Sequence, residues 1–157
     1  MPNDFLIPAT YPRRVLLAVT GLSPQVVTET LCHLCRLRQP AFVPTEIHLV
    51  TTTEGARHAK LTLLHPSQGS FYRLLTDFDL AGQITFDSSP IHVLRDPAGL
   101  ILEDIRSNAD NTAAADAITA LLGDFTADPD CALHVSLAGG RKTLGYYFGH
   151  ALTLRIR

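Results

Sequence analysis

The chain has too few cysteines for a disulfide framework or a cysteine-based zinc site. It has only three cysteines, an odd number, which does not suggest a disulfide framework. Cys32 and Cys35 have redox or zinc spacing, but no second pair of ligands completes a tetrahedral site. Because the two thiols also fall within a helical pattern, we interpret them as small apolar side chains on a packed face. We expect no metal and no cofactor.

The chain also lacks a surplus of positive charge and a long apolar run. Lysine and arginine total 13 against 15 acidic residues, for a net charge of −2. This balance argues against broad binding of duplex DNA or RNA but leaves room for a small anionic ligand in a local basic pocket. No run is long enough to cross a bilayer, and the first residues lack the basic segment of a signal peptide. We expect a cytoplasmic protein without a membrane partner.

The pattern of apolar residues predicts alternating strands and helices. A length of 157 residues, 46% of them hydrophobic, suits one domain with a proper core. After an irregular leader over residues 1–12, strands are expected at 14–20, 46–52 and 131–138, and helices at 24–38, 56–64, 71–78, 110–122 and 141–154. Residues 84–94 hold two β-like pieces that form either a hairpin or two separate strands. This order predicts a Rossmann-like α/β domain over residues 1–157, with a mainly parallel sheet and helices on both faces.

Local signals mark where two of these helices begin. Ser23 followed by Pro24 is typical of a helix cap with proline at the first helical position, and Leu37 is expected on the inner stripe of that helix. Ser107 with Asp110 three residues later fits a capping box, although the usual Glu or Gln is replaced by Asp.

Three loops rich in Gly, Ser and Thr are expected at the same edge of the sheet. Ligands of open parallel sheets bind beyond the carboxyl ends of the strands. The loops after the three long strands hold Thr20, Gly21, Leu22 and Ser23, then Thr51, Thr52, Thr53, Glu54 and Gly55, and finally Ala138, Gly139, Gly140, Arg141, Lys142 and Thr143. Hydroxyls and backbone amides suit phosphates and ribose hydroxyls, so we predict a phosphate-bearing ligand.

The last of these loops carries the strongest signal. Glycines let the backbone approach a ligand closely, and the following helix start offers free N–H groups and the positive end of its dipole. A lysine at that position is disfavoured by the dipole, which favours a functional interpretation of Lys142. The chain lacks the Gly-x-Gly-x-x-Gly fingerprint and the P-loop pattern, because Arg141 rather than glycine precedes Lys142. A dinucleotide oxidoreductase or an ordinary NTPase is therefore a poor fit.

Four segments together resemble a CRISPR-associated family. They read LLAVTGLSPQVVTETL at 16–31, EIHLVTTTEGA at 46–56, LEDIRSNADNTAAADAI at 102–118 and HVSLAGGRKTLGYYFGHAL at 134–152. The chain is similar to short proteins with a CARF domain (CRISPR-associated Rossmann fold) that act as ring nucleases beside type III systems. The resemblance implies a homodimer that binds cyclic oligoadenylate on its two-fold axis and cuts it. Such proteins usually continue beyond the segment that ends here at Arg157, so either a truncated chain or a minimal member is expected.

The resemblance also implies roles for individual residues. Lys142 is implied to contact the ring phosphates and the scissile region, and Ser23 is the second candidate catalytic residue. Candidate ligand-binding residues are Thr20, Gly21, Leu22, Thr52, Thr53, Ser136, Ala138, Gly139, Gly140, Arg141 and Thr143. The implied reaction is a metal-independent attack of a ribose 2′-OH that leaves a 2′,3′-cyclic phosphate, and the implied substrate is cyclic tetra-adenylate.

Two rival functions stay open at this point. One is a sensor that binds the messenger without cutting it and acts through a partner or a further domain. The other, weaker, is a nucleotide-binding enzyme unrelated to CRISPR. The sequence offers no compelling general base: His48 and His134 lie in strands and are interpreted as core or pleat residues.

Overall fold

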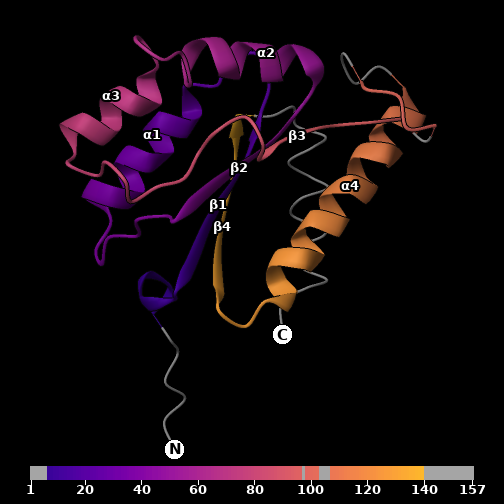
Figure 1. Cartoon of the computed structure of the whole chain (residues 1–157). Coiled ribbons are helices and arrows are strands. Elements are labelled where there is room, and N and C mark those ends of the chain that lie inside the picture. The colour runs from indigo at the N-terminus through magenta and orange to yellow at the C-terminus, as the bar shows by residue number, and fades with distance from the viewer. Residues whose placement is uncertain (1–6, 97, 103–106, 140–157) are drawn as a thin grey trace, which may run out of the picture.

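The fold is built on a sheet of parallel strands. A computed structural model describes residues 7–96, 98–102 and 107–139. Within them β1 (Arg13–Thr20), β2 (Glu46–Thr51), β3 (Ile91–Val93) and β4 (Cys131–Gly139) form a sheet in the order β3-β2-β1-β4 (Figure 1). Every neighbouring pair is parallel. This arrangement confirms the predicted Rossmann-like α/β fold.

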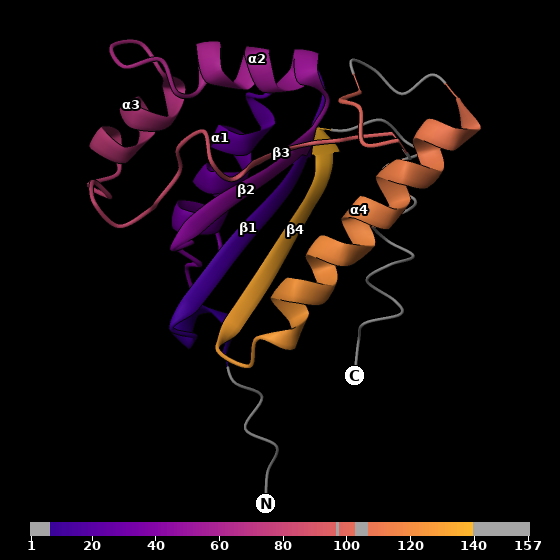
Figure 2. The ribbon, with the colours of Figure 1, turned by 45° about the vertical axis from the view of Figure 1, so that its right-hand side comes forward.

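Helices lie on both faces of the sheet. A short 3-10 turn, η1 (Pro8–Thr10), precedes the sheet, and the helices are α1 (Val26–Cys32), its π-helical continuation η2 (His33–Leu37), α2 (Thr53–Thr62), α3 (Ser70–Asp77) and α4 (Asn108–Ala127). Figure 2 shows α1 and α3 on one side of the strands and α4 on the other. The expected closing helix at 141–154 lies outside the described residues. Among the described helices, none is both long and apolar enough to cross a membrane.

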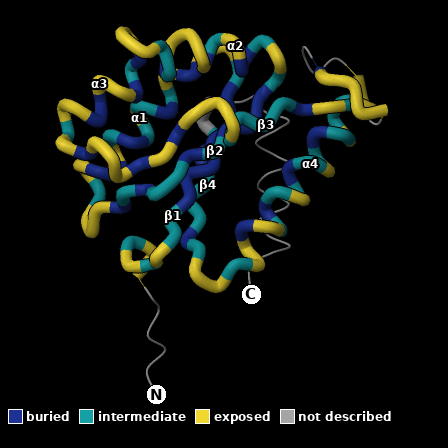
Figure 3. The backbone as a smooth tube through the Cα atoms, in the orientation of Figure 1, coloured by how far each residue is buried: buried dark blue, intermediate teal, exposed yellow. Residues whose placement is uncertain are grey.

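The continuous apolar run of β1 follows from these two covered faces. Val15, Leu17 and Val19 belong to the core beneath α4, whereas Leu16 and Ala18 belong to the core beneath α1 and α3. Each of these side chains is fully buried, and Figure 3 shows the buried centre of the sheet in dark blue. Alternate residues of a strand point to opposite faces, so a strand covered on both sides must be apolar throughout.

The two pieces between residues 84 and 94 do not form a hairpin: the second is the strand β3, and the first makes only an isolated bridge. Thr85 forms an isolated parallel bridge with Glu46, and β3 then pairs in parallel with β2 from Leu49 onward. Both pieces therefore lie along the same edge of β2 and run in the same direction.

The predicted start of the first helix is wrong by two residues. The helix begins at Val26, and its N-cap is Gln25, without a capping side-chain bond, rather than Ser23. The amide of Val27 donates to the carbonyl of Pro24 at 3.0 Å, so Pro24 belongs to a turn that precedes the helix.

The far end of this helix also departs from the prediction. Leu37 is 69% exposed, because the wider π turn changes the angle per residue, and Cys35 is buried on the core side. The capping box of α4 is confirmed: the Asp110 amide donates to Ser107 Oγ at 3.1 Å, and the Ser107 amide donates to Asp110 Oδ2 at 3.2 Å.

Candidate functional site

The three expected loops begin side by side at the carboxyl edge of the sheet. Val19 of β1 is paired with Val50 of β2, so Thr20 and Thr51 follow as neighbours at the ends of their strands. On the other side of β1, Thr20 is paired with Gly139 of β4, after a register shift between Ala18 and Thr20. The parallel register therefore brings the starts of all three loops to one place.

Two buried hydroxyls at this edge have no hydrogen-bond partner. Thr20 is 2% exposed and Thr51 is fully buried, and within the described part of the chain nothing pairs with either Oγ1 atom. Both follow by two residues a member of the same core, Ala18 in β1 and Leu49 in β2, so they lie on the same face. Most buried polar groups in proteins are paired, so two adjacent exceptions at a sheet edge call for an explanation.

A glycine allows the first two loops to approach each other closely. A Cβ added to Gly55 would lie 1.9 Å from Thr51 Oγ1 and 3.0 Å from the carbonyl oxygen of Gly21. The first turn of α2 therefore packs directly onto the end of β2 and onto the loop after β1. Only glycine fits at this position without a shift of the backbone or of Thr51.

The hydroxyls of Thr52 and Thr53 have local structural partners. Thr52 is the N-cap of α2, and its oxygen accepts a hydrogen bond from the Gly55 amide at 3.3 Å. Thr53 donates from its hydroxyl and from its amide to the carbonyl of Leu102, at 3.1 and 3.0 Å. A further segment, at Leu102, thus reaches this edge. Sequence reasoning missed it, because its contact with Thr53 spans 49 positions and leaves no local pattern.

The remaining candidates differ in how they lie. Leu22 is 61% exposed and Ser23 is exposed, while Gly21 is half-buried. Ser136 is buried and its hydroxyl lies 3.4 Å from that of Thr30 in α1, so it is a packed residue below the edge. Ala138 and Gly139 are the last residues of β4. The predicted Gly140, Arg141, Lys142 and Thr143 lie outside the described residues.

Charged side chains from α2 lie near the Thr52 cap. Glu54 accepts a hydrogen bond from Arg57 and forms an ion pair with His58 at 3.5 Å. The hydrogen bond from Arg57 lowers the pKa of Glu54 below its ordinary range. In the described ranges, no group of three His, Cys, Asp or Glu side chains could hold a metal ion.

A second polar cluster lies on the face of the sheet toward α4, and sequence reasoning did not assign it. Arg13, Glu46, His48 and His92 are joined by hydrogen bonds across β1, β2 and β3. One signal was available: Glu46 and His48 alternate with apolar residues, so a polar pair lies on one face of an otherwise apolar strand.

Comparison with known families decides the broad assignment. The model of the family described as CRISPR-associated protein NE0113 matches residues 23–157. The chain belongs to this CRISPR-associated family. The match covers α1 through β4, as well as the residues beyond β4, and begins within the loop that follows β1. No curated protein shows a significant match to the chain.

Membership in the CRISPR-associated protein NE0113 family confirms part of the resemblance seen in the sequence. CRISPR association and the Rossmann-like fold are established. Ring nuclease activity and the binding of cyclic oligoadenylate stay predictions.

Proposed function

We propose that this CRISPR-associated chain binds a cyclic oligoadenylate at the carboxyl edge of its sheet and cleaves it. The observation that carries the proposal is the pair of unpartnered hydroxyls, Thr20 and Thr51, at the point where three loops meet. A buried hydroxyl without a partner costs about 1–3 kcal/mol. A ligand that supplies polar partners, after a small movement of the Gly21 and Gly55 backbone, would recover this free energy.

The symmetry of the ligand favours a dimer. A cyclic oligoadenylate with an even number of nucleotides is compatible with a two-fold axis, so two copies of the chain can offer it the same loops. Leu22 and Ser23, which are exposed beside the edge, are then available to a ligand or to the second copy. We propose a homodimer with the ring on its axis.

The proposed reaction needs no metal. The ribose 2′-oxygen attacks the adjacent phosphorus, the bond from phosphorus to the 5′-oxygen breaks, and a 2′,3′-cyclic phosphate forms. The 2′-OH proton leaves to solvent, and the 5′-oxygen takes up a proton. Alignment of the attacking oxygen supplies part of the roughly 7–11 kcal/mol that positioning can contribute in general. Lys142 and loop amides would stabilise the charge that develops on the phosphoryl oxygens.

One assay tests binding and cleavage together. Purified protein is incubated with cyclic tetra-adenylate or cyclic hexa-adenylate in EDTA, and the products are separated by chromatography. We expect linear products that end in a 2′,3′-cyclic phosphate. Tight binding with both rings intact after long incubation would refute cleavage and favour a sensor. No binding of either ring would refute the proposed ligand.

The chain offers a matched control for the lysine. Lys142→Ala is expected to lose most cleavage while keeping the fold. The other lysine, Lys60, is exposed on α2, and Lys60→Ala is expected to cleave like the unaltered protein. Equal turnover in the two variants would remove Lys142 from the mechanism.

A further inference from the structure

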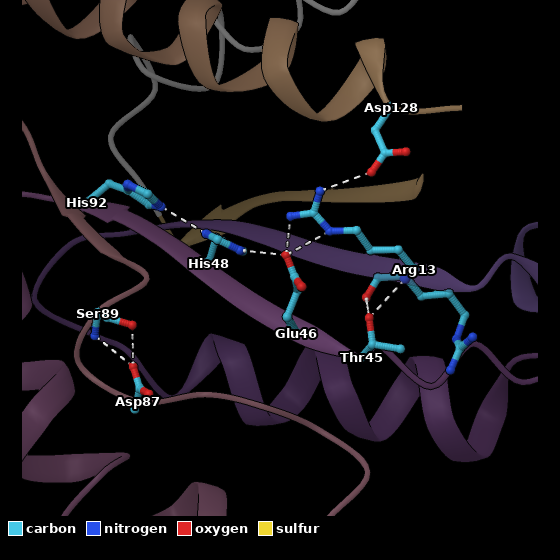
Figure 4. A network of polar contacts seen from close by, with 9 residues as sticks. Arg13, Thr45, Glu46, His48, Asp87, Ser89, His92 and Asp128 are labelled. Carbon is cyan, nitrogen blue, oxygen red and sulfur yellow. Dashed lines mark hydrogen bonds and ion pairs between the residues drawn. The ribbon is translucent and has the colours of Figure 1, made fainter. Parts of the chain in front are cut away.

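The polar cluster on the α4 face is a continuous chain of hydrogen bonds (Figure 4). Glu46 Oε1 accepts from Arg13 Nε at 3.1 Å and from Arg13 Nη2 at 2.5 Å. The same oxygen lies 2.9 Å from His48 Nε2, and His48 Nδ1 lies 2.9 Å from His92 Nε2. The chain therefore runs from β1 through β2 to β3, and its last link joins two histidines from neighbouring strands.

The link between the two histidines has the geometry of an in-plane hydrogen bond. The ring planes differ by only 14° and the ring centroids are 5.2 Å apart. Nearly coplanar rings at this separation meet edge to edge, with one nitrogen facing the other. The ring of Phe125 in α4 packs against that of His48 in a T-shaped arrangement, with centroids 4.8 Å apart, and the side chain of His48 is only 16% exposed. Phe125 therefore restrains the His48 ring on the side toward α4.

The hydrogen-bond chain fixes where the protons are in the neutral pair. The Glu46 carboxylate only accepts, so His48 Nε2 carries the hydrogen and donates. In a neutral imidazole the other nitrogen is then an acceptor, so His92 Nε2 must donate to His48 Nδ1. A first additional proton can enter at His92 Nδ1 and leave this contact intact. A second proton must occupy His48 Nδ1, which would set one N–H against another.

We propose that the His48–His92 pair is a proton-binding switch, which holds β3 on β2 with up to one added proton and releases β3 when both rings are charged. β3 is only three residues long and lies at one end of the order β3-β2-β1-β4, so its backbone pairing with β2 is short. Its register pairs His92 with Val50, which follows His48 by two residues on β2.

The groups around the two histidines act on proton uptake in opposite directions. Glu46 contributes a negative charge, and Arg13 of β1 contributes a positive one. Arg13 also forms a second ion pair, from Nη1 to Oδ2 of Asp128 just after α4, at 3.1 Å. Cys131 of β4 lies near Arg13, and burial raises the pKa of its thiol, so that it stays neutral. Burial, and then the charge of His48, lower the pKa of His92 below its ordinary value of 6.5.

Release of β3 would disturb the candidate site, because the segment after β3 is hydrogen-bonded to it. Just after β3, the amide of Leu94 donates to the carbonyl of Thr51 at 2.9 Å. The same segment continues to Leu102, whose carbonyl holds Thr53. Acidification is therefore expected to loosen the loop after β2. This regulatory effect rests on the proposed function, whereas the switch itself does not.

The test uses the unligated full chain, so its failure is independent of any nucleotide. Ring nitrogen shifts from nuclear magnetic resonance, recorded from above to well below about pH 6.5, report the tautomers and the uptake of protons. We expect His48 and His92 to carry hydrogen on Nε2 when neutral and to charge in two separate steps. Hydrogen exchange of the Leu94 amide is then compared with that of Thr45, which bonds to Arg14 between β1 and β2. Below the second step, Leu94 should lose protection about tenfold per pH unit while Thr45 does not.

Two variants make the result decisive. His92→Gln keeps a donor near the Nε2 position but takes up no proton, so the protection of Leu94 should no longer depend on pH. His134→Gln is the matched control: it removes another half-buried histidine, from β4, and should behave like the unaltered protein. Independent single-step titration of the two rings would overturn the proposal. The same loss of Leu94 protection in His92→Gln would overturn it as well.

Discussion

Replacing Thr51 by valine is expected to stabilise the protein. Valine has the shape of threonine but no hydroxyl, and Thr51 Oγ1 is fully buried without a partner in the described structure. An unsatisfied buried polar group costs about 1–3 kcal/mol, and replacing it with an apolar group of equal shape removes that cost. We therefore expect Thr51→Val to raise the free energy of unfolding by about 1 kcal/mol or more. For a chain of this size, 1 kcal/mol corresponds to roughly 2–4 °C in Tm.

Thr45 provides the matched control for this substitution. Its hydroxyl donates to the carbonyl of Arg14 and accepts from the Arg14 amide, both at 3.0 Å. Thr45→Val should therefore destabilise, by about 1 kcal/mol, because it breaks satisfied bonds. Urea unfolding of the two variants and of the unaltered protein measures the difference directly. If Thr51→Val destabilises as much as Thr45→Val, the Thr51 hydroxyl has a partner in solution and the reasoning fails.

Three further outcomes are expected. Gly55→Ala should destabilise by about 1–3 kcal/mol through its clash with Thr51 Oγ1, and Thr51→Ala in the same chain should recover part of this loss in urea unfolding. Ser107→Ala should cost about 1 kcal/mol by removing the cap of α4, whereas Ser88→Ala at an exposed turn should cost almost nothing; equal costs would contradict the capping role. Burial opposes the charge of Glu46, but its hydrogen bonds outweigh burial and lower its pKa. The resulting stability is complete above about pH 4.5 and is lost as the pH falls through the lower folded-state value, so Glu46→Gln should flatten this part of a stability-against-pH curve.

Features that depend on local chemistry could be predicted from the sequence. The apolar run of β1 indicated a central parallel strand, and Ser107 with Asp110 indicated the start of α4. The Gly, Ser and Thr residues after the strands indicated which loops share an edge, because parallel strands end together. Each of these signals lies within a few residues of the feature that it predicts.

Features that depend on long-range packing could not be predicted. The π turn of η2 follows from a bond between positions five apart, Arg38 to His33, for which no residue pattern is specific. The hydroxyls of Thr20 and Thr51 lack partners because of how residues from several distant segments pack around them. The contact between His48 and His92 spans 44 positions and arises only from the register of β3 on β2.

The broken strand along β2 also bears on how copies of this protein can associate. Thr85 and β3 pair with the same strand, but Pro90 and its neighbours separate them, so the outer rim of β3 offers no long row of free backbone groups. Short, interrupted rims are poor templates for adding a foreign strand. A second copy is therefore not expected to extend the sheet across β3. On this side of the sheet, two chains are therefore expected to associate through loops or helices and not through added strands.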